Sequence, residues 1–254
     1  MSTEKLLKVK SLHVNAAGEE ILHGIDMEID RGEVHVLMGP NGAGKSTLGG
    51  ALIGNPRYDI TEGEILYKGS DVIGVPTDQR ARSGMFLSFQ TPLEVPGITV
   101  SAFIRSALEQ RQGKRMRLGE YKRELKRVMN LLQIDPSYAE RDLNVGFSGG
   151  EKKKAEILQL LMLQPALAIL DETDSGLDVD AVRTVSRGIE EFQKSRESSL
   201  LIITHSTKIL ESLTVDHTHV LAGGRLIASG DGSLVSEINE TGFEKYIRLA
   251  SEQS

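Results

Sequence analysis

The stretch FSGGEKKKAEILQLLMLQPALAILDETDSGLD, residues 147–178, decides the fold of this chain. A serine and two glycines precede an apolar helix that we expect over Glu151–Leu163. An unbroken apolar strand follows at Leu167–Leu170 and ends in two carboxylates, Asp171 and Glu172. Short apolar strands that alternate with helices are typical of a parallel sheet covered on both faces, which binds ligands at the carboxyl ends of its strands.

A glycine-rich loop upstream supplies the second part of this pattern. Residues 39–47, GPNGAGKST, match the P-loop pattern G-x-x-x-x-G-K-[ST] in full. A strand expected at Val34–Met38 precedes the loop and a helix expected at Lys45–Ile53 follows it, as the motif requires. Lys45 should reach the β- and γ-phosphates of ATP, and Ser46 should offer its hydroxyl to Mg²⁺. We expect the whole loop to bind nucleotide: Gly39, Pro40, Asn41, Gly42, Ala43, Gly44, Lys45, Ser46 and Thr47.

The two carboxylates after the apolar strand complete a hydrolytic site. Asp171 suits the Walker B role and would hold Mg²⁺ directly or through water. Glu172 is then placed to polarise the attacking water as general base. Without the P-loop, both could be solvated turn residues; with it, the sequence predicts a Mg²⁺-dependent ATPase.

The other segments predict one α/β body with a helical insert. Apolar residues alternate with polar ones between residues 7 and 29, which predicts strands joined through a turn at 15–20. Residues 99–144 have helical character, and a strand is expected at Leu200–Thr204. A hairpin near Gly223 and a helix near Gly242–Ala250 close the chain. We expect residues 1–90 and 161–254 to form the catalytic core, and residues 91–160 to form an inserted helical subdomain ending in the signature helix.

Composition excludes several classes of function. The chain has 254 residues, a net charge of −6 and no cysteine, so it forms no disulfide and has no thiolate for catalysis or for a zinc or iron–sulfur site. No apolar run approaches the ~20 residues of a membrane span, and the first residues lack the apolar core of a signal peptide. We expect a cytoplasmic protein with no membrane insertion and no nucleic-acid partner.

A basic segment stands out within this acidic chain. Residues 105–127 hold nine Lys or Arg and three Glu, a local charge of +6, so the rest of the chain carries −6 − 6 = −12. A solvated helical face is one interpretation. The alternative is a docking surface, formed together with the loop 90–97, for an acidic patch on a partner protein.

The motif before the Walker B strand resembles the signature of the ATP-binding cassette family, which commonly reads LSGGQ. Ser148, Gly149 and Gly150 match it, whereas Phe147 and Glu151 depart from it. Ser148 and Glu151 also form a capping-box pattern for the helix that follows. The resemblance implies a P-loop NTPase of this type, with an antiparallel N-terminal β subdomain, a mostly parallel core sheet and an inserted helical subdomain.

The same resemblance assigns further residues. Gln90 matches the Q-loop glutamine, which senses Mg²⁺ and water, and His205 matches the switch histidine that contacts the γ-phosphate. Ser175–Asp178 match the D-loop. In this family the signature of one subunit closes over ATP bound to another, which implies an ATP-dependent dimer in which residues such as Ser148 and Asp178 complete the partner's nucleotide site.

Three longer segments resemble the SufC group of these ATPases, which act in Suf iron–sulfur cluster assembly. They are residues 144–153 (NVGFSGGEKK), 171–178 (DETDSGLD) and 89–97 (FQTPLEVPG). This resemblance implies SufB- and SufD-like scaffold subunits as partners, remodelled by ATP-driven closure. The alternative is the ATPase subunit of a membrane transporter with a separate permease, although transport cassettes commonly have Pro-Thr-Ser-Ala where this chain has Thr173-Asp174-Ser175-Gly176.

Three narrower expectations follow. The first aromatic residue is Tyr58, so adenine has no N-terminal aromatic to stack on, although His13 could substitute weakly. An ion pair between Lys152–Lys154 and Glu172 or Asp174 could hold the base away from water until a partner realigns it. His217 and His219 alternate in an expected strand, which favours a place on its surface rather than in a metal site.

Overall fold

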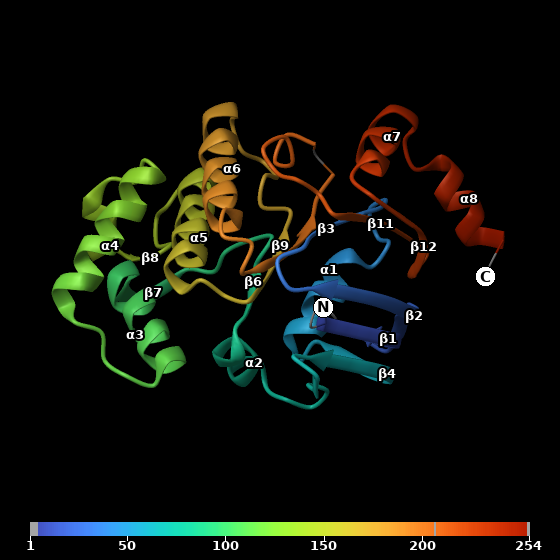
Figure 1. The fold of residues 1–254 in the computed structure, drawn as a ribbon, viewed down its shortest axis with the longest axis horizontal. Helices are drawn as coiled ribbons and strands as arrows, with labels where there is room; N and C mark the ends of the chain where they lie inside the picture. The colour runs from blue at the N-terminus through green and yellow to red at the C-terminus, as the bar shows by residue number, and fades with distance from the viewer. Residues whose placement is uncertain (1–4, 206, 253–254) are drawn as a thin grey trace.

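The structure is a computed structural model, and it describes residues 5–205 and 207–252. Its central sheet has six strands in the order β12-β11-β3-β10-β9-β6 (Figure 1). From β11 to β6 all neighbours are parallel, and only β12 runs antiparallel. This is the mostly parallel core that the sequence predicts. The strands are β3 (Val34–Met38), β6 (Met85–Ser88), β9 (Leu167–Asp171), β10 (Ser199–Ile203), β11 (His217–Ala222) and β12 (Arg225–Gly230).

A second, antiparallel sheet of order β2-β1-β4-β5 lies on one face of the core. One apolar cluster joins the two sheets through helix α1, because Leu12 and Ile25 of the outer sheet, Leu48 of α1 and Leu201 of the core all belong to it. Burying this surface is the main favourable term that holds the layers together. The elements are β1 (Lys5–Ala16), β2 (Glu19–Asp30), β4 (Tyr58–Tyr67), β5 (Ser70–Asp71) and α1 (Lys45–Ile53).

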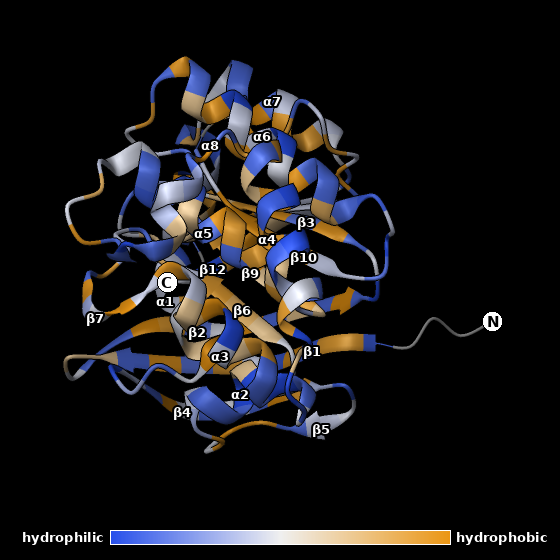
Figure 2. Ribbon diagram, turned by 90° about the vertical axis from the view of Figure 1, so that its left-hand side faces the viewer, coloured by the Kyte–Doolittle hydropathy of each residue, from blue (hydrophilic) through white to orange (hydrophobic). Residues whose placement is uncertain are grey.

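Helices cover the opposite face and extend away from it. In Figure 1, α3 and α4 lie farthest from the outer sheet, with α5 and α6 between them and the core. A second apolar cluster joins these helices to the core strands, and Figure 2 shows β6 and β9 as apolar while α2 is largely polar. The elements are α2 (Thr77–Ser83), β7 (Val95–Thr99), α3 (Val100–Gln112), α4 (Leu118–Leu131), a 3₁₀ turn (Pro136–Glu140), β8 (Asp142–Leu143), α5 (Gly149–Leu163), α6 (Val179–Gln193), α7 (Ser233–Thr241) and α8 (Glu244–Glu252).

Among the described residues, no helix has the length and apolarity that crossing a bilayer requires. The helix predicted over Lys45–Ile53 is confirmed at both ends, and the predicted Walker B strand differs only by including Asp171. Strand β4 went unpredicted, because its charged residues and Gly63 break the alternation. Its place comes from backbone pairing with β1, which a local pattern does not carry.

The prediction of two surface histidines on β11 was wrong for His219. Its side chain is buried, and its ring nitrogens lie 3.0 Å from His35 Nδ1 and 2.8 Å from Ser229 Oγ. Burial, with smaller effects of His35 and His217, lowers the pKa of His219 to about 4. Leu221, two residues further along the same face of β11, belongs to the apolar cluster between the core and the outer sheet, so this face is covered and its alternation does not mark a solvent face. His217, at the strand start, is half-exposed.

Candidate nucleotide site

The P-loop lies where β3 meets α1, and two of its glycines are required sterically. A Cβ on Gly39 would lie 2.0 Å from the carbonyl oxygen of Leu221, and one on Gly44 would lie 2.7 Å from Leu22 Cδ2. Gly44 also has φ of 104°, which side chains rarely adopt, and it caps the start of α1. The loop can therefore bring its backbone N–H groups and the helix N-terminus close to an anion.

Lys45 points back into this loop. Its ammonium donates to the carbonyl oxygens of Gly39 and Pro40, at 2.8 and 2.9 Å, and its side chain is buried. Burial lowers the pKa of Lys45, while the negative charges of Glu172 and Asp171 oppose that shift. A buried cation with only two neutral acceptors is suited to bind a negatively charged group brought to the loop.

Asp171, at the carboxyl end of β9, has the character of a cation ligand. It is buried, and its Oδ1 accepts no hydrogen bond from any described residue. Burial raises its pKa, whereas the hydroxyl of Ser46 is the strongest influence that lowers it. Two oxygen donors on neighbouring elements, one of them an unsatisfied carboxylate oxygen, fit a hard cation such as Mg²⁺.

Glu172 is the point at which distant parts of the chain meet. Its Oε2 accepts a hydrogen bond from Gln90 Nε2 at 2.7 Å, and its Oε1 lies 2.9 Å from His205 Nε2. Its φ of 47° is left-handed, an arrangement that costs about 1–3 kcal/mol and persists only where neighbours impose it. Here the Glu172 N–H donates to the carbonyl of Ile203 at 2.8 Å. The structure thus brings together the predicted base, the Q-loop glutamine and the switch histidine.

A buried ion pair on α5, which the sequence analysis missed, anchors the start of the Q-loop. Lys153 Nζ lies 3.1 Å from Glu156 Oε2 and donates to the Phe89 carbonyl at 2.5 Å, while Glu156 Oε1 accepts from the Phe89 N–H at 2.9 Å. Both charged side chains are almost fully buried. The signal was available, because a Lys and a Glu three residues apart on the apolar face of a helix are neighbours.

The predicted ion pair between the lysines of α5 and the Walker B carboxylates was wrong. Lys152 instead pairs with Glu94 at 2.8 Å, and Asp174 accepts from Thr204 Oγ1 at 3.1 Å. The first turns of α5 face the segment 89–94, so their lysines contact the Q-loop. Glu172 is held by Gln90 and His205 instead.

The predicted capping box at the signature is present. Ser148 Oγ accepts from the Glu151 N–H at 3.3 Å, and Glu151 Oε2 accepts from the Ser148 N–H at 2.7 Å. The other oxygen of Glu151 accepts from the Tyr138 hydroxyl. The Arg141 guanidinium lies 4.3 Å and 4.7 Å from the ring centres of Tyr138 and Phe147. The two departures from LSGGQ, Phe147 and Glu151, therefore both contact Tyr138.

The remaining predicted residues lie in two places. Asp178 caps α6 by accepting from the Ala181 N–H at 2.8 Å. A cavity of about 190 Å³ lies between the D-loop and the switch and is lined in part by Glu172, Ser175 and His205. In the described part of the chain, no hydrogen bond or ion pair joins signature residues 148–150 to P-loop residues 39–47.

Known proteins resemble the chain in both sequence and structure. A sequence model of the ABC transporter family matches residues 22–175. Vegetative protein 296 of Bacillus subtilis (strain 168) is 45% identical over 240 residues, which cover 94% of this chain and 92% of that protein. A probable ATP-dependent transporter of Cyanophora paradoxa, ycf16, is 43% identical over 251 residues, 96% of each chain.

Solved structures show the same fold. The ATP-binding subunit of an ABC transporter is 28% identical with a TM-score of 0.76, over 96% of this chain and 99% of that one. A dimeric post-hydrolysis cassette bound to ADP and Pi has the same TM-score at 18% identity, over 89% and 98%. The predicted fold class is confirmed. By its family match and its relatives along nearly the whole length, the chain belongs to the ABC transporter family, as an ATP-binding cassette.

Proposed function

We propose that the chain is a Mg²⁺-dependent ATPase that drives conformational change in a cytoplasmic iron–sulfur cluster assembly complex. The observation that carries the hydrolytic half is the position of Glu172. Its carboxylate is fixed at both oxygens by Gln90 and His205. It follows directly on Asp171, the buried carboxylate that faces the P-loop serine.

Each residue has a distinct task in hydrolysis. The P-loop N–H groups and Lys45 bind the phosphates of ATP, and Lys45 exchanges its two loop carbonyls for phosphate oxygens. Ser46, Asp171 and Gln90 would hold Mg²⁺, which would supply positive charge against the phosphates of the nucleotide. Glu172 accepts the proton of the attacking water, and His205 contacts the γ-phosphate.

The signature requires a second copy of the chain. Ser148 and Gly149 are exposed and have no polar contact with the chain's own P-loop, so ATP bound there needs another source for these donors. We propose that Ser148, Gly149, Gly150 and Asp178 of one copy complete the nucleotide site of the other when ATP is bound. The dimeric state of a cassette with the same fold supports this arrangement.

Glu172→Gln tests the role of the base. The amide can keep the present contacts, because its oxygen can accept from Gln90 and its NH₂ can donate to His205 in the other tautomer. We expect ATP binding to persist and phosphate release to fall by about 10²–10⁴-fold, the contribution of general-base catalysis. Glu211→Gln, on an exposed turn, is the matched control. A normal rate in Glu172→Gln would remove this residue as the base.

The assignment to cluster assembly rests on the SufC-like segments. One of them, residues 171–178, contains a glycine whose backbone conformation is unusual. Gly176 in the D-loop adopts φ of 72°, a conformation that strains alanine. Transport cassettes commonly have alanine at this position. Glycine at residue 176 therefore allows the D-loop a backbone conformation that alanine would disfavour. The absence of cysteine adds a constraint, since a chain without thiolates contributes motion to cluster assembly rather than cluster ligands.

The surface beside the Q-loop fits docking of a SufB- or SufD-like scaffold. Phe89, Leu93 and Val95 are large apolar side chains that are 47%, 72% and 38% exposed. A cavity of about 340 Å³ continues from Phe89 to Phe86 and Phe103. Apolar anchors inside a polar rim are typical of protein interfaces. Because this loop also contains Gln90, a scaffold bound here would act directly on the group that holds Glu172.

The basic segment 105–127 forms the charged rim of that surface in this proposal. Some of its cations are already used within the chain: Arg105 pairs with Glu109, and Arg127 pairs with Glu124. Others form no ion pair among the described residues: besides Arg111, which donates to backbone carbonyls, these are Lys114, Arg115, Lys122, Arg123 and Lys126. Reversing the charges of Arg115, Arg117 and Lys122 should weaken scaffold binding at low salt. Lys194→Glu, an exposed reversal on the end of α6, should leave binding intact; equal binding by the triple variant would refute the docking role.

The alternative is an ATPase subunit of a membrane transporter, and the Cyanophora paradoxa relative is named as a probable ATP-dependent transporter. Affinity purification of the tagged chain from its native host, from both the soluble and the detergent-extracted membrane fractions, separates the two. Soluble scaffold subunits that raise the ATPase rate support cluster assembly. An integral permease as the stoichiometric partner would replace that assignment and leave the ATPase chemistry intact.

A further inference from the structure

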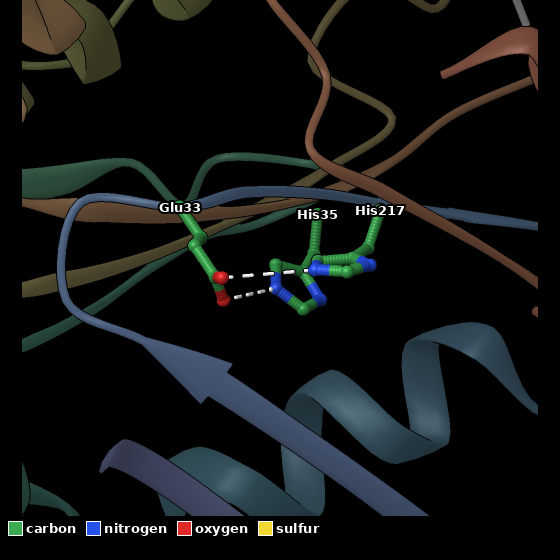
Figure 3. Close-up of side chains that lie close together, drawn as sticks. All are labelled: Glu33, His35 and His217. Carbon is green, nitrogen blue, oxygen red and sulfur yellow. Dashed lines mark hydrogen bonds and ion pairs between the residues drawn. The ribbon is translucent and has the colours of Figure 1, made fainter. Parts of the chain in front are cut away.

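Three potential metal ligands meet at the amino-terminal edge of the core sheet. His35 of β3 and His217 of β11 are paired in register on adjacent parallel strands. Glu33 stands two residues before His35, so its side chain lies on the same face. Figure 3 shows the three side chains converging on one space. The opposite ends of these strands lead to the nucleotide edge, so this cluster is separate from the ATP site.

The spacing of the ligand atoms suits one metal ion. One ligand atom from each residue lies within 4.8 Å of the other two. His35 Nε2 lies 2.9 Å from Glu33 Oε2, and His217 Nε2 lies 3.6 Å from Glu33 Oε1. In a tetrahedral zinc site with metal–ligand distances of 2.0–2.1 Å, ligand atoms are about 3.3 Å apart. The two imidazole–carboxylate separations lie on both sides of that value and the third pair of ligand atoms lies within 4.8 Å, so side-chain rotations can bring the three to it.

We propose that Glu33, His35 and His217 bind a divalent transition-metal ion, with Zn²⁺ as the best match. Two imidazoles and one carboxylate favour zinc over Mg²⁺ or Ca²⁺, which prefer oxygen ligands throughout. Three protein ligands leave one coordination position for water. Entry is possible from solvent, because the side chains of His217 and Glu33 are 50% and 25% exposed.

Two of the proposed ligands, Glu33 and His35, already have hydrogen-bond partners that would hold them in place. The Glu33 carboxylate accepts from the Asp30 N–H at 2.7 Å, which restricts its orientation. Behind His35, His219 connects the Nδ1 of that ring to Ser229 Oγ. Metal-binding histidines usually have such a partner on the second ring nitrogen, because it fixes the tautomer and the plane of the ring.

The hydrogen bonds from Glu33 through His35 and His219 to Ser229 all have one donor-to-acceptor direction, and zinc binding would reverse it at His219. An ionised Glu33 can only accept, so His35 carries its proton on Nε2. His35 Nδ1 then accepts from His219 Nε2–H, and His219 Nδ1 accepts from Ser229. Zinc on His35 Nε2 requires the proton on Nδ1 instead. His219 then accepts at Nε2 and donates from Nδ1, so both rings change tautomer while each keeps one proton.

Zinc titration of the metal-free, nucleotide-free full chain against a chromophoric chelator tests the site. We expect one ion per chain. His217→Ala should weaken binding by at least about 100-fold, since loss of an outer partner alone costs 10–100-fold. Ser229→Ala should weaken it by less than that range, because Ser229 contacts His219 and not a metal ligand. The matched control is His23→Ala, which removes a histidine near another glutamate, Glu20, and should leave the affinity unchanged.

Imidazole ¹⁵N NMR of the same protein provides a second readout, independent of affinity. We expect the protons of His35 and His219 to move from Nε2 to Nδ1 when zinc is added. Unchanged zinc affinity in His217→Ala, loss of binding in His23→Ala, or unchanged tautomers in the zinc-loaded protein would each overturn the proposal.

Discussion

Gly188 of α6 packs closely against α5, the helix that begins at the signature, and its replacement by alanine gives a quantitative test of that packing. A Cβ at this position of α6 would lie 2.3 Å from Ile157 Cγ2 on α5 and 2.8 Å from Leu132 Cδ2 after α4. Alanine in a helix gains up to about 1 kcal/mol over glycine. Overpacking costs about 1–3 kcal/mol, and an overlap this deep belongs near the top of that range. We therefore expect a net loss of about 1–2 kcal/mol.

Thermal unfolding with a matched variant measures this balance. For a chain of this size the loss should lower the Tm by roughly 2–8 °C. Gly119→Ala, on α4, is the control, because no heavy atom lies within 4 Å of the new Cβ. It should be neutral or slightly stabilising, by at most about 1 kcal/mol. If Gly188→Ala were as stable as Gly119→Ala, the close packing of α6 against α5 would not be present in solution.

Two further predictions concern charge and base recognition. Lys153→Met leaves Glu156 buried without its cation, so urea unfolding should show a loss of about 3–5 kcal/mol. Adding Glu156→Gln removes the unpaired charge and keeps an acceptor for the Phe89 N–H, so it should recover part of the loss; a loss below about 1 kcal/mol in the single variant would contradict a buried pair. No aromatic residue precedes Tyr58 to stack on adenine. Calorimetric titration should therefore find a dissociation constant for GTP within about tenfold of that for ATP, a difference in binding free energy of at most about 1.4 kcal/mol. A much stronger preference for ATP would show another base-recognition element.

Local patterns predicted much of the fold and of the nucleotide edge. The P-loop, the Walker B carboxylates and the capping box at Ser148 are set by residues within one turn or loop, so the sequence carries their geometry directly. Chain order within a known motif set assigned Gln90 and His205 to the nucleotide site, and in the structure both contact Glu172.

The features that were missed depend on partners far along the chain. Strand β4 has a weak pattern of its own and is fixed by pairing with β1. Lys153 reads as one of three surface lysines until α5 packs against Phe89, which buries it. His219 reads as a surface residue until His35, 184 residues earlier in the chain, packs against it. In each case the deciding contact is long-range, and no window of sequence contains both members.

The two proposed sites occupy opposite ends of the same strands, which makes them separable by experiment. His35 is the second residue of β3 and Gly39 follows the strand, so four residues, or about 13 Å, separate His35 from the start of the P-loop. Strand β3 is fully buried, β11 is buried beyond His217, and Gly39 of the loop lies directly against Leu221 of β11. His217→Ala therefore removes a metal ligand without touching a nucleotide ligand, and Glu172→Gln does the reverse. Any effect of zinc on ATP affinity must pass through the β3–β11 pair, so His217→Ala should abolish it along with zinc binding.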